Sequence, residues 1–188
     1  MIKRLLVILA FIAPGLALLL FYLKPAADNA IIIPIAHFYV VAFTTFSAMV
    51  ISILLAASLG TEAKARHVLA ATGFGVIGSV FFLHGLATPG ALINYVHPAL
   101  GWSAWLSLFA GGLLFAIAGL DGPNGLPRWL PLRMVNIGAL CFVLLYSAIA
   151  IFAPGWLSQL EDLANPMLLQ IIFWVSLVFL GFGRRPAG

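Results

Sequence analysis

Long apolar runs alternate with short polar breaks along the whole chain. Six of these runs approach or reach the roughly 20 residues that a helix needs to cross the hydrocarbon core of a membrane. The breaks between them hold most of the prolines and all five acidic residues, as turns and membrane interfaces require. The pattern predicts an all-α, polytopic integral membrane protein, a single domain over residues 1–188 built as a six-helix bundle. The predicted transmembrane helices cover residues 5–23, 35–58, 67–87, 99–120, 133–153 and 167–183.

The composition agrees with a membrane protein. Hydrophobic residues make up 64% of the 188 residues and charged residues only 7%, whereas a soluble domain carries about 25% charged residues. A soluble domain of this size could not cover so much apolar surface, so membrane lipids are the expected surroundings. The net charge of +4 comes from short basic clusters between the runs, and no nucleic-acid partner is expected. The single cysteine, Cys141, lies inside an apolar run and is expected to be a small core residue.

The basic residues are unequally divided between the two sides that six spans would create. One side would hold only Lys24. Cytoplasmic loops are enriched in lysine and arginine, so the other side is predicted to be cytoplasmic, with both termini. The expected location is a bacterial-type inner (cytoplasmic) membrane, with the first run retained as a helix rather than cleaved as a signal peptide. The basic residues of the cytoplasmic side are Lys3, Arg4, Lys64, Arg66, Arg128, Arg133, Arg184 and Arg185.

The sequence GFGVIG at residues 73–78 has the spacing of a dinucleotide-binding loop. Such a loop follows a strand and opens a helix, but this one lies inside a predicted membrane helix. Small residues at these positions let a neighbouring backbone, or a flat ligand, come close. We therefore expect the glycines to serve close packing and not nucleotide binding.

Three of the four histidines fall toward the outer side of this topology. His37 opens the second run, His84 lies near the end of the third, and His97 stands directly before the proline that would start the fourth. His67 lies about 25 Å from His84 along the helix axis and is expected among the lipid head groups of the other side. The sequence thus predicts a site formed by His37, His84 and His97.

Helical periodicity places further polar and small residues around His37. Thr44 lies within about 20° of His37 on the helix, and Ala48 belongs to the same stripe. We expect this stripe to face other helices, because hydroxyl and imidazole groups in hydrocarbon need partners.

The three histidines allow several kinds of site. His37, His84 and His97 could bind copper or zinc together. Two of them could instead be the axial ligands of haem b, with the glycines of the third run making space for the ring. They could also contact a pigment or a quinone, or bind no cofactor and fix helix packing through hydrogen bonds.

A catalytic role is the less favoured interpretation. No predicted helix interior contains Asp, Glu, Lys or Arg, which a proton-coupled carrier needs. The chain has no H-E-x-x-H sequence, and its serines and histidines form no pattern with a buried acid.

Two stretches resemble a known membrane domain. HFYVV at residues 37–41 and FLHGLATPGAL at residues 82–92 are similar to the six-helix N-terminal domain of some bacterial class III adenylate or guanylate cyclases and related signalling proteins. The resemblance covers roughly residues 35–120. It implies a sensory or redox module in which His37 and His84 matter, because in redox-responsive versions such residues are thought to hold haem b and respond to quinone. This sequence shows no cyclase domain, and with His67 alone on the inner side it would support at most one haem.

Three functions remain open from the sequence. The favoured one is a non-catalytic sensory or accessory subunit of a larger membrane complex, with a protein partner or further copies of itself. The second is a haem b anchor that passes electrons between quinone and a partner. The third is a purely structural membrane subunit.

Overall fold

The computed structural model describes residues 34–60, 64–121, 126 and 131–163, with separate residues within 16–23 and 171–179. The chain divides into two compact units, residues 1–33 and 34–188, and every helix given bounds here belongs to the second. In the described ranges the structure is helical, and the only strand-like feature is an isolated bridge between Pro89 and Ile93. The helices are α2 (Pro34–Ala57), α3 (Ala65–Leu86), α4 (Ala99–Ala118), α5 (Leu132–Phe152) and α6 (Pro154–Leu163).

Four of the predicted spans correspond to helices of the structure. The helices α2, α3, α4 and α5 are each long and apolar enough to cross a membrane. Their bounds lie within two residues of the predicted runs, because prolines and short polar segments interrupt the apolar pattern at both ends. The predicted helices at 5–23 and 167–183 lie mostly outside the described residues, so their bounds are not given by the structure. The described part of the chain is therefore helical and contains four helices that could span a membrane, which indicates a membrane protein.

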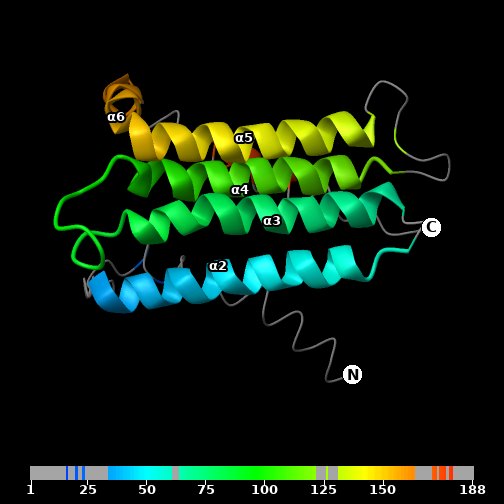
Figure 1. Ribbon diagram of the computed structural model, residues 1–188, viewed down its shortest axis with the longest axis horizontal. Coiled ribbons are helices and arrows are strands. Elements are labelled where there is room, and N and C mark those ends of the chain that lie inside the picture. Colours follow the sequence, from blue (N-terminus) through cyan, green and yellow to red (C-terminus); the bar gives the residue numbers. More distant parts are fainter. Residues whose placement is uncertain are drawn as a thin grey trace. The chain divides into compact units, whose positions relative to one another are not determined.

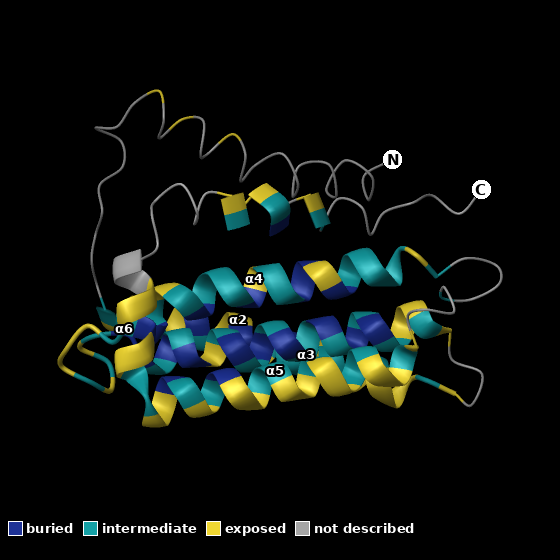
Figure 2. Ribbon diagram, turned by 90° about the horizontal axis from the view of Figure 1, so that it is seen from above, coloured by how far each residue is buried: buried dark blue, intermediate teal, exposed yellow. Residues whose placement is uncertain are grey.

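The four long helices lie side by side, with α3 between α2 and α4 (Figure 1). α3 packs extensively against α2 and α4 and also contacts α5. In the most apolar 18-residue stretch of each helix, 44% of α3 is buried, against 17% of α2 and 11% of α5. Figure 2 shows the buried positions concentrated on α3 and many exposed positions on α5. Many residues of α2 are exposed as well. These exposed positions carry large apolar side chains, as a lipid-facing surface does.

The glycines of α3 serve close helix packing, as the sequence predicted. A β-carbon at Gly78 would come within 2.8 Å of Met49 Cγ and 3.3 Å of the Thr45 carbonyl oxygen on α2. A β-carbon at Gly73 would come within 3.1 Å of the Phe115 ring on α4. Both α2 and α4 thus approach α3 so closely at these positions that only glycine avoids a clash.

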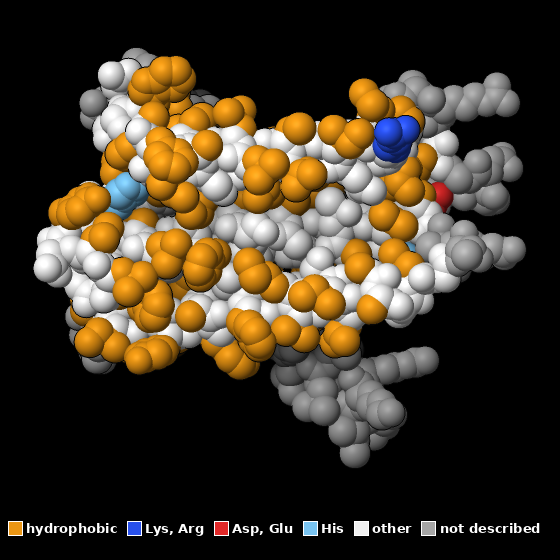
Figure 3. Space-filling model, viewed as in Figure 1, with side chains coloured by type: hydrophobic (Ala, Val, Ile, Leu, Met, Phe, Trp, Pro, Cys, Tyr) orange, Lys and Arg blue, Asp and Glu red, His pale blue; other side chains and the backbone are white. Residues whose placement is uncertain are grey.

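On the visible face of the bundle, the Lys, Arg and acidic side chains lie at one end, and a histidine patch lies at the opposite end (Figure 3). At the charged end, Asp121 lies just after α4, and its Oδ2 accepts a hydrogen bond of 2.9 Å from the backbone N–H of Arg66. This carboxylate satisfies one of the free N–H groups in the first turn of α3. The contact joins the end of α4 to the start of α3.

Polar contacts inside the bundle also link neighbouring helices. Ser103 and Tyr146 share a buried hydrogen bond of 2.8 Å between α4 and α5. Thr72 on α3 bonds to Asn136 on α5 at 3.0 Å. Cys141 is exposed on α5, so its prediction as a core residue was wrong, because α5 turns most of its surface away from the other described helices.

Candidate histidine site

The structure brings His37 and His84 into direct contact. His37 lies in the first turn of α2 and His84 in the last turn of α3, so the two residues meet where antiparallel helices begin and end. Their Nε2 atoms are 3.0 Å apart, and the ring centroids are 5.2 Å apart with the rings inclined by 68°. His84 is half-buried and His37 is exposed. The contact is therefore a hydrogen bond between two imidazoles at the rim of the bundle.

The hydrogen-bond partners fix which ring nitrogen carries the proton. His84 Nδ1 lies 2.6 Å from the carbonyl oxygen of Leu100 in the first turn of α4. A carbonyl oxygen can only accept, so His84 Nδ1 carries the hydrogen and donates it. In neutral His84 the Nε2 atom then has a free lone pair, and it must accept its hydrogen bond from the Nε2–H of His37.

The surroundings of His84 hold its ring in one orientation. The ring of Phe81, one turn earlier on α3, stacks on the imidazole with centroids 5.0 Å apart and planes inclined by 11°. Thr88 is buried and donates a hydrogen bond of 3.1 Å to the carbonyl oxygen of His84. His84 thus contacts three segments at once: α2 through His37, α4 through Leu100, and its own helix through Phe81.

The segment ATPGALI at residues 87–93 ends α3 and turns the chain toward α4. Pro89 follows the C-cap Ala87 and Thr88, where a helix commonly stops. Gly90 has a φ of 78°, a conformation that favours glycine. Its N–H donates to the carbonyl oxygen of Ile93 at 2.7 Å. A β-carbon at Gly90 would lie 3.3 Å from Pro34, the first residue of α2, so this turn packs against the start of α2 next to His37.

His97 caps α4 and does not join the pair. Its Nδ1 accepts a hydrogen bond of 3.1 Å from the backbone N–H of Ala99, and its carbonyl oxygen accepts from Leu100 N–H at 2.9 Å. A nitrogen that accepts from an amide has no hydrogen of its own, so Nε2 of neutral His97 carries the proton. Within the described residues, no group of three or more potential metal ligands forms. The structure therefore does not assemble the predicted three-histidine site.

Two other expectations can be compared with the structure. His67 is exposed in the first turns of α3, at the far end of that helix from His84, as expected. Thr44 is also exposed and bonds only to the carbonyl oxygen of Val40 in its own helix. Thr45, not Thr44, faces α3 and is buried. The predicted stripe was therefore right at Ala48, which is buried, and wrong at Thr44, since the adjacent Thr45 takes the interior position.

The paired histidines do not fit a haem held between them. Axial imidazoles lie on opposite faces of the porphyrin ring, with the iron between them. A direct contact of 3.0 Å between the two Nε2 atoms leaves no space for the iron and its ring. The space predicted at the glycines is filled as well, since a β-carbon at Gly85 would meet Val41 at 3.1 Å.

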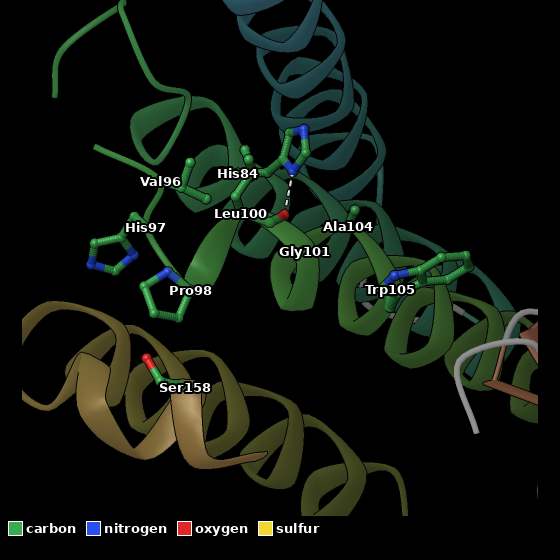
Figure 4. Close-up of a pocket in the computed structure, with 9 residues that line it drawn as sticks. All are labelled: His84, Val96, His97, Pro98, Leu100, Gly101, Ala104, Trp105 and Ser158. Atoms are coloured by element: carbon green, nitrogen blue, oxygen red, sulfur yellow. Dashed lines mark hydrogen bonds between the residues drawn. The ribbon is translucent and has the colours of Figure 1, made fainter. Parts of the chain in front are cut away.

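An open pocket of about 480 Å³ adjoins the site (Figure 4). Its volume falls within the range of about 300–1,000 Å³ that is usual for small-molecule sites. However, the rings of His84 and His97 point in different directions, and His84 Nδ1 is engaged with Leu100. The pocket therefore lacks a set of converging polar groups. It is lined by His84, Val96, His97, Pro98, Leu100, Gly101, Ala104, Trp105 and Ser158.

Sequence reasoning found both histidines of the pair but missed two of their partners. Phe81 precedes His84 by three residues, a spacing that places two side chains on one helix face and could have indicated the stacking. The Leu100 carbonyl has no signal in the sequence, because every residue carries one. Comparisons with protein-family models, with curated proteins and with solved structures gave no match to this chain.

Proposed function

We propose that this chain is a non-catalytic sensory module of a membrane, in which the contact between His37 and His84 is the ligand-responsive element. The observation that carries the proposal is the 3.0 Å separation of the two Nε2 atoms across two helices. A ligand that binds either nitrogen must break this hydrogen bond. The binding event would then alter how α2 is held against α3.

The attachment of α2 supports a responsive role. Among the described helices α2 packs mainly against α3, and two polar contacts join this pair. One is the histidine contact, and the other is the hydrogen bond of 2.7 Å from Ser52 Oγ to the carbonyl oxygen of Ala71 near the charged end. Loss of the first would leave α2 held at the second, so that α2 could tilt about Ser52.

The wider setting of the module is part of the same proposal. The asymmetry of lysine and arginine along the sequence supports six spans with both termini in the cytoplasm of a bacterial cell, which places the histidine pair on the outer side. The similarity of HFYVV and FLHGLATPGAL to the membrane domains of signalling proteins supports a sensory role. In this proposal the module acts through a protein partner or a second copy, and a quinone is an alternative ligand.

Spin labels at the histidine end of the bundle, which lies farthest from the Ser52 contact, would test the proposal. We would replace Tyr39 on α2 and Trp156 on α6, both exposed, with labelled cysteines in a Cys141→Ser background, and measure their separation by pulsed electron resonance. If α2 tilts, His37→Ala should shift or broaden the distance distribution by about 1–2 Å, the size of typical helix shifts.

His97→Ala is the matched control, since it also removes an outer imidazole but leaves the pair intact. Its distance distribution should equal that of the parent protein. If His37→Ala also leaves the distribution unchanged, the pair only holds helices together, and the chain is a structural subunit.

A further inference from the structure

We infer that the histidine pair is a binding site for one divalent transition-metal ion that prefers imidazole, with Zn²⁺ as the representative. The ion would lie between Nε2 of His37 and Nε2 of His84. This inference rests on the proposed function and names the ligand of the same site. Unlike the prediction from the sequence, it does not include His97.

The separation of the two nitrogens suits a shared ion. Zinc binds histidine nitrogen at about 2.0–2.1 Å, so two such bonds at a tetrahedral angle place the nitrogens about 3.4 Å apart. The observed separation is 3.0 Å. Adjustment of the rings by a few tenths of an ångström would admit the ion. The His37 ring can make this small movement because the side chain is exposed.

His84 already has the protonation state of a metal ligand. Ligating histidines usually donate their second ring N–H to a carbonyl or carboxylate, which fixes the tautomer and directs the free lone pair. His84 donates from Nδ1 to the Leu100 carbonyl at 2.6 Å, and its free lone pair on Nε2 faces His37. The stacked ring of Phe81 holds the imidazole plane. The energetic cost of orienting this ligand is therefore met before the ion arrives.

Binding needs only a tautomer change in His37. Without metal, His37 carries its hydrogen on Nε2 and donates it to His84. When the ion binds, the hydrogen bond breaks, two metal–nitrogen bonds form, and the His37 proton moves through solvent to Nδ1. Both imidazoles stay neutral, so no net proton is released. The move is possible because His37 is exposed to solvent at the rim of the bundle.

The remaining coordination positions would be filled by water. In the described ranges no third histidine, cysteine or carboxylate joins the pair, and His97 uses its Nδ1 to cap α4. Two protein ligands give weaker binding than the three or four of catalytic and structural zinc sites. An ion held in this way exchanges readily, as a sensor requires. Cu²⁺ should bind more tightly than Zn²⁺, following the general order of metal affinities.

Nuclear magnetic resonance of the ring nitrogens would test the inference directly. The chain has four histidines, so ¹⁵N-histidine labelling gives a small spectrum that single substitutions can assign. The protein would be purified in detergent without a polyhistidine tag and titrated with ZnCl₂. We expect the signals of His37 and His84 to change together at about one equivalent, with the His37 proton moving from Nε2 to Nδ1. The signals of His67 and His97 should not change.

Zinc affinity of variants gives a second measurement. His37→Ala should weaken binding at least tenfold, and its exposed position makes it the safer variant for folding. His67→Ala and His97→Ala remove the same chemical group elsewhere and should bind zinc as the parent does. Equal affinity in the parent and in His37→Ala would overturn the inference, as would parallel titration of all four histidines.

The zinc titration tests the metal site and the spin-label experiment tests the sensory function, so either proposal can fail without the other. If zinc does not bind but His37→Ala still moves α2, the sensory proposal stands with another ligand and the metal inference is overturned. If zinc binds at the pair and α2 stays fixed, the metal site stands and the sensory proposal is overturned.

Discussion

At the scale of single residues, the position of the proton separates the histidines from one another. His84 donates from Nδ1 to a carbonyl, which leaves its Nε2 open to a hydrogen bond or an ion. His97 accepts at Nδ1 from an amide, so it stabilises the start of α4. His37 donates to His84 and can exchange this proton with solvent. One side chain type thus performs three tasks, and the neighbouring backbone groups decide which.

Two threonines, buried Thr45 on α2 and half-buried Thr72 on α3, also differ in their hydrogen bonds. Thr45 Oγ1 is buried and has no hydrogen-bond partner among the described residues, whereas Thr72 Oγ1 donates to the carbonyl oxygen of Val68 and contacts Asn136. Thr45→Val should leave stability unchanged or raise it by up to about 1 kcal/mol, because an unsatisfied buried hydroxyl is costly. Thr72→Val, the same chemical change, should lower stability by about 0.6 kcal/mol and by no more than about 1.7 kcal/mol, the average and the maximum for hydrogen bonds between membrane helices.

Unfolding of both variants in mixed micelles would measure this difference. Equal losses in the two variants would show that Thr45 has a partner or that its hydroxyl is hydrated.

At the scale of elements, the contact between α2 and α3 depends on small residues. Gly78→Val should lower the free energy of unfolding by about 1–3 kcal/mol, the usual cost of overpacking. The added side chain would meet both Met49 and the backbone of α2. Gly138→Val is the matched control, since Gly138 also lies inside a long helix but has no neighbour within 4 Å of its β-carbon position.

The same unfolding measurement applies to both glycine variants. A loss at Gly138 as large as that at Gly78 would mean that another surface packs on α5.

Much of the element scale could be predicted from the sequence. The bounds of the four described spans follow from the apolar runs and their breaks, and the depth of His37 and His84 follows from the bounds. Which threonine of α2 faces α3 could not be predicted. Thr44 and Thr45 are adjacent, and the angle of 100° per residue does not give the direction in which the neighbouring helix lies. The contact of His84 with the Leu100 carbonyl depends on the tertiary arrangement of α3 and α4, which leaves no mark on residue types, whereas the cap formed by His97 is a local contact with Ala99.

At the scale of the whole molecule, the two ends of the bundle differ in chemistry. Lys64, Arg66 and Arg133 lie at the end where α3 and α5 begin, and the histidine pair lies at the opposite end. In intact bacterial cells a membrane-impermeant thiol reagent should therefore label Tyr95→Cys, which is exposed beside the histidine site, but not Ser58→Cys. Both variants need the Cys141→Ser background.

Disrupted cells should allow the reagent to reach both positions, which provides the control. Labelling of Ser58→Cys alone in intact cells would reverse the proposed orientation and place the histidines on the cytoplasmic side.

The central position of α3 has a consequence for how the protein is made. α2 and α5 are the most apolar of the four helices and can remain stable in lipid alone, whereas α3 is less apolar and presents glycines and His84. During synthesis α3 follows α2 directly, so it can leave the translocation channel together with α2 as a hairpin. α4 then supplies the Leu100 carbonyl to His84, and the histidine pair is complete only after this later helix has joined. Substitutions that weaken the contact between α2 and α3 should therefore lower the yield of inserted protein, in addition to any effect on the stability of the protein that does fold.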